Sequence, residues 1–159
     1  MGYLDKIELI ASLGKEKIST EYEIPYLAGY SNDGKTIYID KRLPKWFKLK
    51  DDRAINVHKY LIVHERTEKL LEDTKEYKYP YAHEKATASE RRAVEADGIE
   101  WDEYQNYMLK MVKKLKTFSG PLPKDLDTKP EKDTHDYYRY HKIREQQGVQ
   151  SDIKDRIPS

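Results

Sequence analysis

The chain has 159 residues, of which 37% are charged, and its 30 basic and 29 acidic side chains leave a formal net charge of +1. This length predicts one compact domain, and the balanced charge excludes a field strong enough to recruit nucleic acid or anionic lipid by electrostatics alone. Because the chain has no cysteine, it has no disulfide framework and no thiolate nucleophile, and a metal site would have to use His and carboxylate ligands.

The first third of the chain predicts one helix and one β-hairpin. Apolar residues at helical spacing over residues 3–14, followed by a glycine stop, predict a short amphipathic helix. The segments EYEIPYLAGY and KTIYIDKRL are rich in Tyr and Ile and flank SNDG, a composition typical of a hairpin turn. Pro25 cannot donate to a ladder, so its strand should be an edge strand or be interrupted there. Asp40 is expected to cap the end of the second strand, and PKWFKLKDD, which begins at Pro44, is expected to be a loop.

Three helices are predicted in the centre of the chain. Residues 52–73 carry an apolar face with ionisable residues in its middle, and residues 81–97 form a second helix that Gly98 closes. Residues 100–118 form a third helix with lysines near its C-terminal end. Its apolar stripe is typical of a core and consists of Trp101, Tyr104, Met108, Met111, Val112 and Leu115. The fold class is therefore α+β, with a short hairpin or small sheet packed on a bundle of about three helices.

The composition changes after residue 118, where the chain becomes Pro-rich and then charged. We therefore divide the chain into an α+β domain, residues 1–118, and a C-terminal appendage, residues 119–159, with a short helix around residues 137–147 as its one candidate element. Since the charges of the appendage cancel, its HDYYRYHKIR cluster is interpreted as a packing or protein-binding segment rather than a nucleic-acid site.

Two pairs of ionisable residues interrupt the apolar helical faces. His64 and Glu68 are four residues apart and converge on one point, while Glu65 lies about 100° round the helix. On the next helix, His83 and Glu90 are seven residues apart and share a face. Burying a carboxylate costs several kcal/mol unless an arginine, a hydrogen-bond network or a metal ion compensates its charge. The pattern predicts a metal site between the two helices.

Two other arrangements compete with that prediction. In the first, Glu68 pairs with Arg91 or Arg92 in a buried polar network, and His83 is a core histidine with satisfied hydrogen bonds. In the second, a helical bundle holds a carboxylate-bridged dimetal site, which requires a Glu-x-x-His motif on each of two helices. Neither His64 nor His83 follows a glutamate by three residues, which argues against a dimetal site.

At these residues the sequence resembles the zincin metallopeptidases, whose signature H-E-x-x-H lies on a helix. The resemblance covers about residues 37–95, through the strand TIYID, the helix segment VHERTE and the later segment AHEKATASE. It departs from the family at Glu68, which stands where the second histidine belongs. A looser resemblance extends to small phage and bacterial proteins of zincin-like type. The zincin resemblance implies a minimal zincin-like domain that binds one zinc ion.

The resemblance also implies roles for individual residues. His64, Glu68 and His83 would bind zinc, and Glu65 would be the general base that activates a metal-bound water. Glu90 would be either an alternative third ligand or the acceptor that orients His83 through its other ring nitrogen.

Other polar residues near this motif are interpreted more simply. Tyr79 or Tyr81 would donate a hydrogen bond to a developing oxyanion, although core packing is the competing interpretation in a chain with 14 tyrosines. His58 does not share the face of His64 and is expected at the surface.

The resemblance thus implies a zinc-dependent, peptidase-like hydrolase, with a peptide or protein substrate that pairs with an edge strand near residues 37–40. The alternative is a non-enzymatic interaction or structural protein that keeps a zincin-like fold with a structural or absent metal, which Glu68 in place of histidine favours. No apolar run approaches the roughly 20 residues of a membrane span, so no membrane partner is expected and the predicted location is cytoplasmic.

Overall fold

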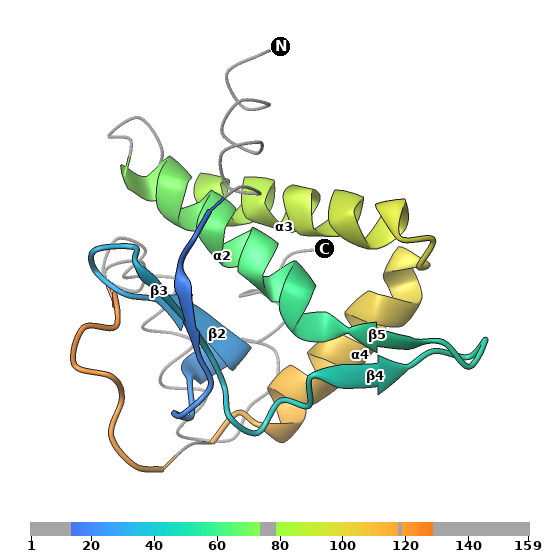
Figure 1. Cartoon of the computed structure of the whole chain (residues 1–159), viewed down its shortest axis with the longest axis horizontal. Coiled ribbons are helices and arrows are strands. Elements are labelled where there is room, and N and C mark those ends of the chain that lie inside the picture. The colour runs from blue at the N-terminus through green and yellow to red at the C-terminus, as the bar shows by residue number, and fades with distance from the viewer. Residues whose placement is uncertain (1–13, 74–78, 118, 129–159) are drawn as a thin grey trace.

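The computed structural model describes residues 14–73, 79–117 and 119–128 of the chain. The helices expected over residues 3–14 and 137–147 therefore lie outside the described residues, apart from Gly14. The described residues form two small sheets and the helices α2, α3 and α4 around a shared core (Figure 1). This arrangement confirms the α+β fold class.

The first sheet contains the predicted hairpin and one additional strand. Strands β2 (Ala28–Tyr30) and β3 (Thr36–Ile39) pair antiparallel, and β1 (Lys17–Ser19) pairs parallel to the other side of β3. The strand order is β1-β3-β2, so β3 is the central strand. The prediction that the segment near residues 37–40 is an edge strand is wrong, because β1 and β2 pair with its two sides. The chain is interrupted at Pro25 as predicted, since a short 3-10 turn, η1 (Pro25–Leu27), precedes β2.

The segment expected to be a loop after Pro44 forms a second hairpin instead. Strands β4 (Trp46–Lys48) and β5 (Ala54–Asn56) pair antiparallel and project from the body of the molecule (Figure 1). Phe47 stacks on Tyr107 of α4 (Trp101–Lys114) with ring centroids 3.8 Å apart, and Ile55 is buried. The hairpin therefore depends on packing partners that are distant in sequence, which the local pattern did not contain.

The three helices confirm the predicted helical segments with shifted ends. They are α2 (Val57–Asp73), α3 (Tyr79–Ala96) and α4 (Trp101–Lys114). Helix α2 begins later than predicted because β5 occupies the residues before it. Gly98 adopts a φ of 74° after α3, where Ile99 N donates to Val94 O at 3.3 Å, as expected of a glycine C-cap. None of the described helices combines the length and the apolar character needed to cross a bilayer.

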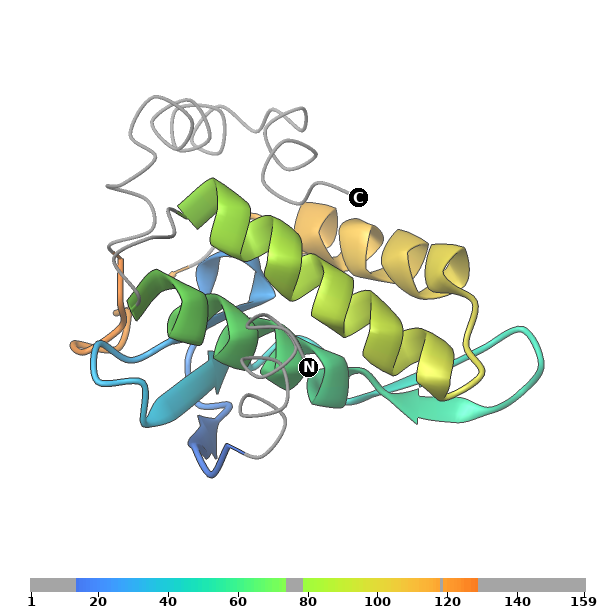
Figure 2. The same cartoon turned by 90° about the horizontal axis from the view of Figure 1, so that it is seen from above.

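Helices α2 and α3 lie side by side, and α4 packs against the same core (Figure 2). The apolar stripe of α4 is buried as predicted, and sheet, hairpin and helices all contribute to the core. Among its least exposed members are Ile37, Ile39, Val57, Val94 and Tyr104.

Within residues 119–128, the described part of the predicted appendage, the segment 125–127 lies beside the end of β2 and the residues that follow it. Asp127 N donates to Tyr30 O at 2.8 Å, and Asn32 N donates to Asp125 O at 2.8 Å. These bonds cover the edge of β2 that β3 leaves open. The beginning of the appendage thus packs on the domain, while the division of the chain at residue 118 stays a prediction.

Asp40, expected only to cap a strand, is a fully buried anchor after β3. Its Oδ2 accepts from Ile24 N at 2.9 Å and from Arg42 Nη2 at 2.7 Å, and its Oδ1 accepts from Arg42 N at 2.8 Å. Burial opposes ionisation, but the hydrogen bonds from Arg42 and Ile24 outweigh it and lower the pKa of Asp40. This carboxylate therefore ties the chain before η1 to the end of β3.

We expect Asp40→Asn to lower the free energy of unfolding at pH 7 by about 1–3 kcal/mol, because buried donors would lose an ionised acceptor. A folded-state pKa below the unfolded value gives stability that is present above the unfolded pKa and lost as pH falls through the folded pKa. The difference between wild type and Asp40→Asn should therefore shrink below about pH 4. Urea unfolding at pH 7 and at lower pH measures this difference in the free energy of unfolding. Asp51→Asn is the control, because Asp51 is exposed and its replacement should change the free energy of unfolding little. A difference that stays constant into acid would contradict this role.

Candidate metal centre

The predicted site residues meet in the seam between α2 and α3. Helix α2 supplies His64, Glu65 and Glu68, and α3 supplies His83 and Glu90. All five side chains are buried, with exposed fractions of 2–7%. The spacing along each helix places its residues on one face, and the packing of α2 against α3 brings the two faces together.

Three ligand atoms form a compact triangle. His64 Nε2 lies 3.2 Å from Glu68 Oε2 and 3.3 Å from His83 Nδ1, and His83 Nδ1 lies 3.0 Å from Glu68 Oε2. Tetrahedral zinc with bonds of 2.0–2.2 Å separates its ligands by about 3.3–3.6 Å. The triangle matches that spacing within a few tenths of an ångström, so His64, Glu68 and His83 form a buried group that could hold a metal ion.

The electrostatics of the triangle favour an ionised carboxylate. Burial opposes the charge on Glu68, but hydrogen bonds with His64 and His83 outweigh it and lower its pKa. Burial likewise opposes the charge on His64, yet its hydrogen bonds with Glu68 and Glu90 raise its pKa above the usual value. Glu68 is therefore held in the anionic form that a cation requires.

Glu90 is directed at His64, where the sequence suggested either a bond to His83 or a third ligand. His64 Nδ1 donates to Glu90 Oε1 at 2.8 Å, and the Tyr104 hydroxyl donates to Glu90 Oε2 at 2.6 Å. Seven residues span about 10 Å of helix, so a carboxylate two turns beyond His83 reaches α2 instead. Because one oxygen of Glu90 accepts from His64 and the other accepts from Tyr104, Glu90 lies where a carboxylate that orients His64 would lie, behind the three candidate ligand atoms.

The competing arginine network is not the arrangement found. Arg91 and Arg92 are exposed, and Arg91 pairs with Glu95 at 3.4 Å. Glu68 faces the two histidines instead. The buried carboxylate is therefore compensated by imidazoles, which are also metal ligands.

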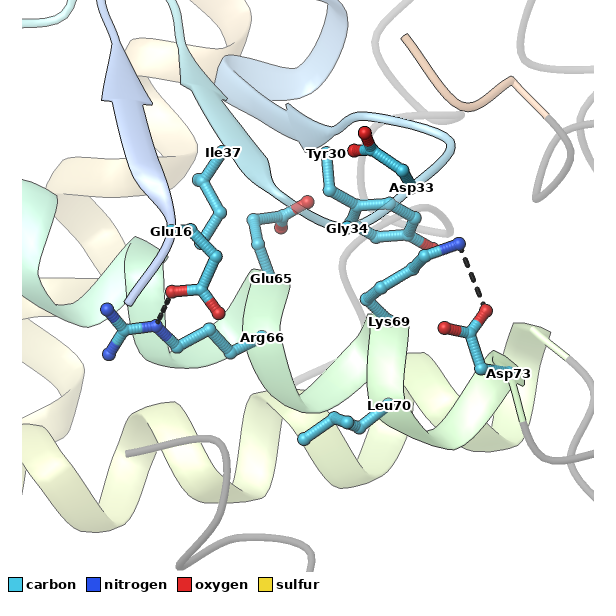
Figure 3. A pocket seen from close by; sticks show the side chains of 10 residues that line it. All are labelled: Glu16, Tyr30, Asp33, Gly34, Ile37, Glu65, Arg66, Lys69, Leu70 and Asp73. Atoms are coloured by element: carbon cyan, nitrogen blue, oxygen red, sulfur yellow. Dashed lines mark hydrogen bonds and ion pairs between the residues drawn. The ribbon is translucent and has the colours of Figure 1, made fainter. Parts of the chain in front are cut away.

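Glu65 joins this triangle to a cleft. Its Oε2 lies 3.9 Å from His64 Nε2, and its side chain lines a cleft of about 160 Å³ between α2 and the first sheet (Figure 3). Apolar side chains and charged side chains share the walls. The lining residues are Glu16, Tyr30, Asp33, Gly34, Ile37, Glu65, Arg66, Lys69, Leu70 and Asp73.

Ion pairs frame the cleft on both sides of Glu65. Arg66 pairs with Glu16, which precedes β1, and Lys69 pairs with Asp73 at 3.0 Å (Figure 3). These residues were not predicted as part of the site, because Glu16 is 50 positions from its partner and no local signal links the two.

Tyr30 is a further wall residue that sequence reasoning missed. Its hydroxyl donates to Glu72, and the Lys69 ammonium lies 5.3 Å from the centre of its ring. Burial, followed by the nearby carboxylates of Glu68, Glu72 and Glu65, raises the pKa of Tyr30. Tyr30 therefore remains a protonated hydroxyl beside the cleft.

The remaining predicted residues have simpler surroundings. Tyr79 begins α3, and the structure does not describe its side chain. The ring of Tyr81 lies against Lys85, whose Nζ is 5.3 Å from the ring centroid. Their role as oxyanion donors stays a prediction. His58, expected at the surface, is half-buried with its Nε2 3.1 Å from Leu43 O.

The geometry defines a buried candidate site for one metal ion, with three ligand atoms, a histidine-orienting carboxylate and a second carboxylate at a cleft. No family model, curated protein or solved structure matches this chain.

Proposed function

We propose that the protein is a zinc-dependent hydrolase of zincin-like, peptidase-like type. The observation that carries this proposal is the triangle of His64 Nε2, Glu68 Oε2 and His83 Nδ1, with sides of 3.0–3.3 Å. Catalytic zinc sites use three protein ligands and keep a fourth position for water or substrate, whereas structural sites close with four. A set of two histidines and one carboxylate supports the catalytic kind.

Glu65 supplies the base in this proposal. A bound zinc ion would lower the pKa of water and polarise a substrate carbonyl. Glu65 faces the cleft and lies 3.9 Å from a ligand nitrogen, so it can accept a proton from water that attacks the carbonyl carbon. It would then deliver that proton to the leaving nitrogen as the carbon–nitrogen bond breaks.

A peptide is the substrate class that the zincin resemblance implies. Because β3 pairs with a strand on each side, it has no open edge for a substrate. A substrate backbone would pair instead with β1, an outer strand of the same sheet. Glu16, just before β1, lines the cleft beside Glu65. An extended peptide added to the outer edge of β1 would therefore run close to the base.

A non-enzymatic interaction protein with a structural metal is the second candidate. It is favoured by Glu68 in place of the second histidine and by exposed fractions of only 2–6% for the three ligand residues. In this candidate, the C-terminal appendage, residues 119–159, would supply the protein-binding surface. The two candidates differ in the effect expected of Glu65→Gln, which should remove hydrolysis only if the protein is an enzyme.

Elemental mass spectrometry on protein purified without a histidine tag tests the metal site. We expect about one zinc per chain in the wild type and none in His83→Ala, because that variant removes one corner of the triangle. His58→Ala is the matched control and should retain zinc, since His58 contacts the Leu43 carbonyl instead. Wild-type protein that holds no metal after incubation with zinc would contradict the proposal.

A further inference from the structure

We propose that Tyr104 of α4 is a positioning residue of the metal centre, which holds Glu90 so that Glu90 orients His64. This inference rests on the proposed function, because the orientation matters for a bound ion. Tyr104 was expected only to fill the core, and it does so with an exposed fraction of 0%. Its hydroxyl, however, points at the site.

A continuous hydrogen-bonded chain links the three helices. The Tyr104 hydroxyl on α4 donates to Glu90 Oε2 on α3 at 2.6 Å. The other oxygen, Glu90 Oε1, accepts from His64 Nδ1 on α2 at 2.8 Å. The opposite nitrogen of the same ring, His64 Nε2, is a corner of the ligand triangle. Tyr104 thus acts on the triangle through two intermediate groups and does not touch it.

The chain determines which nitrogen of His64 can bind a metal. Metal binding requires the neutral imidazole, which has one protonated nitrogen and one with a free lone pair, and a carboxylate beside Nδ1 keeps the single proton there. The lone pair is then on Nε2, facing Glu68 and His83. A carboxylate held at only one oxygen can turn about its side-chain torsions, so the second bond from Tyr104 keeps Glu90 in place.

The support behind Tyr104 is rigid. Its ring meets Tyr60 edge-on with centroids 5.4 Å apart and lies 5.5 Å from the ring of Trp101. Packing on these sides restricts the hydroxyl to one position, as a ligand-orienting group requires. Removal of the hydroxyl alone should therefore loosen Glu90 without opening the core.

Tyr60 offers a closely matched control. It is buried like Tyr104, and its hydroxyl donates to a carboxylate, Asp97 Oδ2, at 2.7 Å. Asp97, however, also pairs with Lys59 and belongs to the end of the α3 segment, away from the ligand triangle. Tyr60→Phe and Tyr104→Phe therefore lose the same kind of bond, but only the second bond leads to a metal ligand.

Zinc affinity, measured by competition with a chromophoric chelator, provides the first test. We expect Tyr104→Phe to raise the zinc dissociation constant about 10-fold or more, the range seen when groups that orient ligands are removed. Tyr60→Phe should leave the constant unchanged, and urea unfolding of both variants in chelator should show similar losses of stability. Zinc affinity in Tyr104→Phe that is unchanged or tighter overturns the inference.

The proton on His64 Nδ1 provides a second readout that needs no metal. In chelator-treated wild type and Tyr60→Phe, we expect a slowly exchanging imidazole N–H resonance assigned to His64, and we expect Tyr104→Phe to broaden or lose it. If the wild type binds no zinc, the proposed function fails, but this resonance still tests the positioning role. A resonance equally preserved in Tyr104→Phe overturns the inference.

Discussion

Replacement of Glu65 with glutamine should lower the rate of peptide hydrolysis by about 10²–10⁴-fold while zinc stays bound. The amide has nearly the size and shape of the carboxylate but cannot accept the proton from water. The three ligand atoms of the triangle belong to other residues, so the metal content should not change. A fluorogenic peptide library identifies a cleaved sequence first, and the rate with that sequence is then compared between variants alongside elemental analysis.

Glu84→Gln is the matched control for this variant. Glu84 stands beside His83 in the second His-Glu pair of the chain, but it is exposed on α3. The control should keep both zinc and activity. Hydrolysis that survives in Glu65→Gln would contradict the role of Glu65 as base. A protein with zinc but no hydrolysis of any peptide in the wild type would favour the interaction protein.

His64→Ala should abolish zinc binding and should also destabilise the metal-free protein by about 3–5 kcal/mol. In the wild type, His64 lies between two buried carboxylates, 3.2 Å from Glu68 Oε2 and 2.8 Å from Glu90 Oε1. Removal of the imidazole leaves both acids in the seam without their shared partner. Urea unfolding in the presence of chelator measures the loss in the absence of metal.

His58→Ala, on the same helix, calibrates that loss. The His58 imidazole makes one described hydrogen bond, to Leu43 O, so the cost should be about 1 kcal/mol and zinc should remain bound. If His64→Ala unfolds at the same urea concentration as the wild type, with and without chelator, the interpretation of the seam as a metal site is wrong.

The sequence by itself determined the features that depend on local spacing. His64 and Glu68 had to share a face once their segment became helical, because residues four apart lie one above the other. Gly98 marked the end of α3 because a backbone with positive φ favours glycine, and the observed φ is 74°. The absence of cysteine limited the ligand types before any fold was known.

Only the tertiary structure decided which of these groups meet. The same Glu90 could have oriented His83 or bound the metal, and the packing of α3 on α2 directs it to His64, 26 residues away. Tyr104 had the periodicity of a core residue, and only the position of α4 brings its hydroxyl to Glu90. The predictions likewise did not include β1 or the β4–β5 hairpin, whose Phe47 stacks on Tyr107 of α4. Helical periodicity is a property of neighbouring residues, whereas these contacts join residues that are close only after the chain has folded.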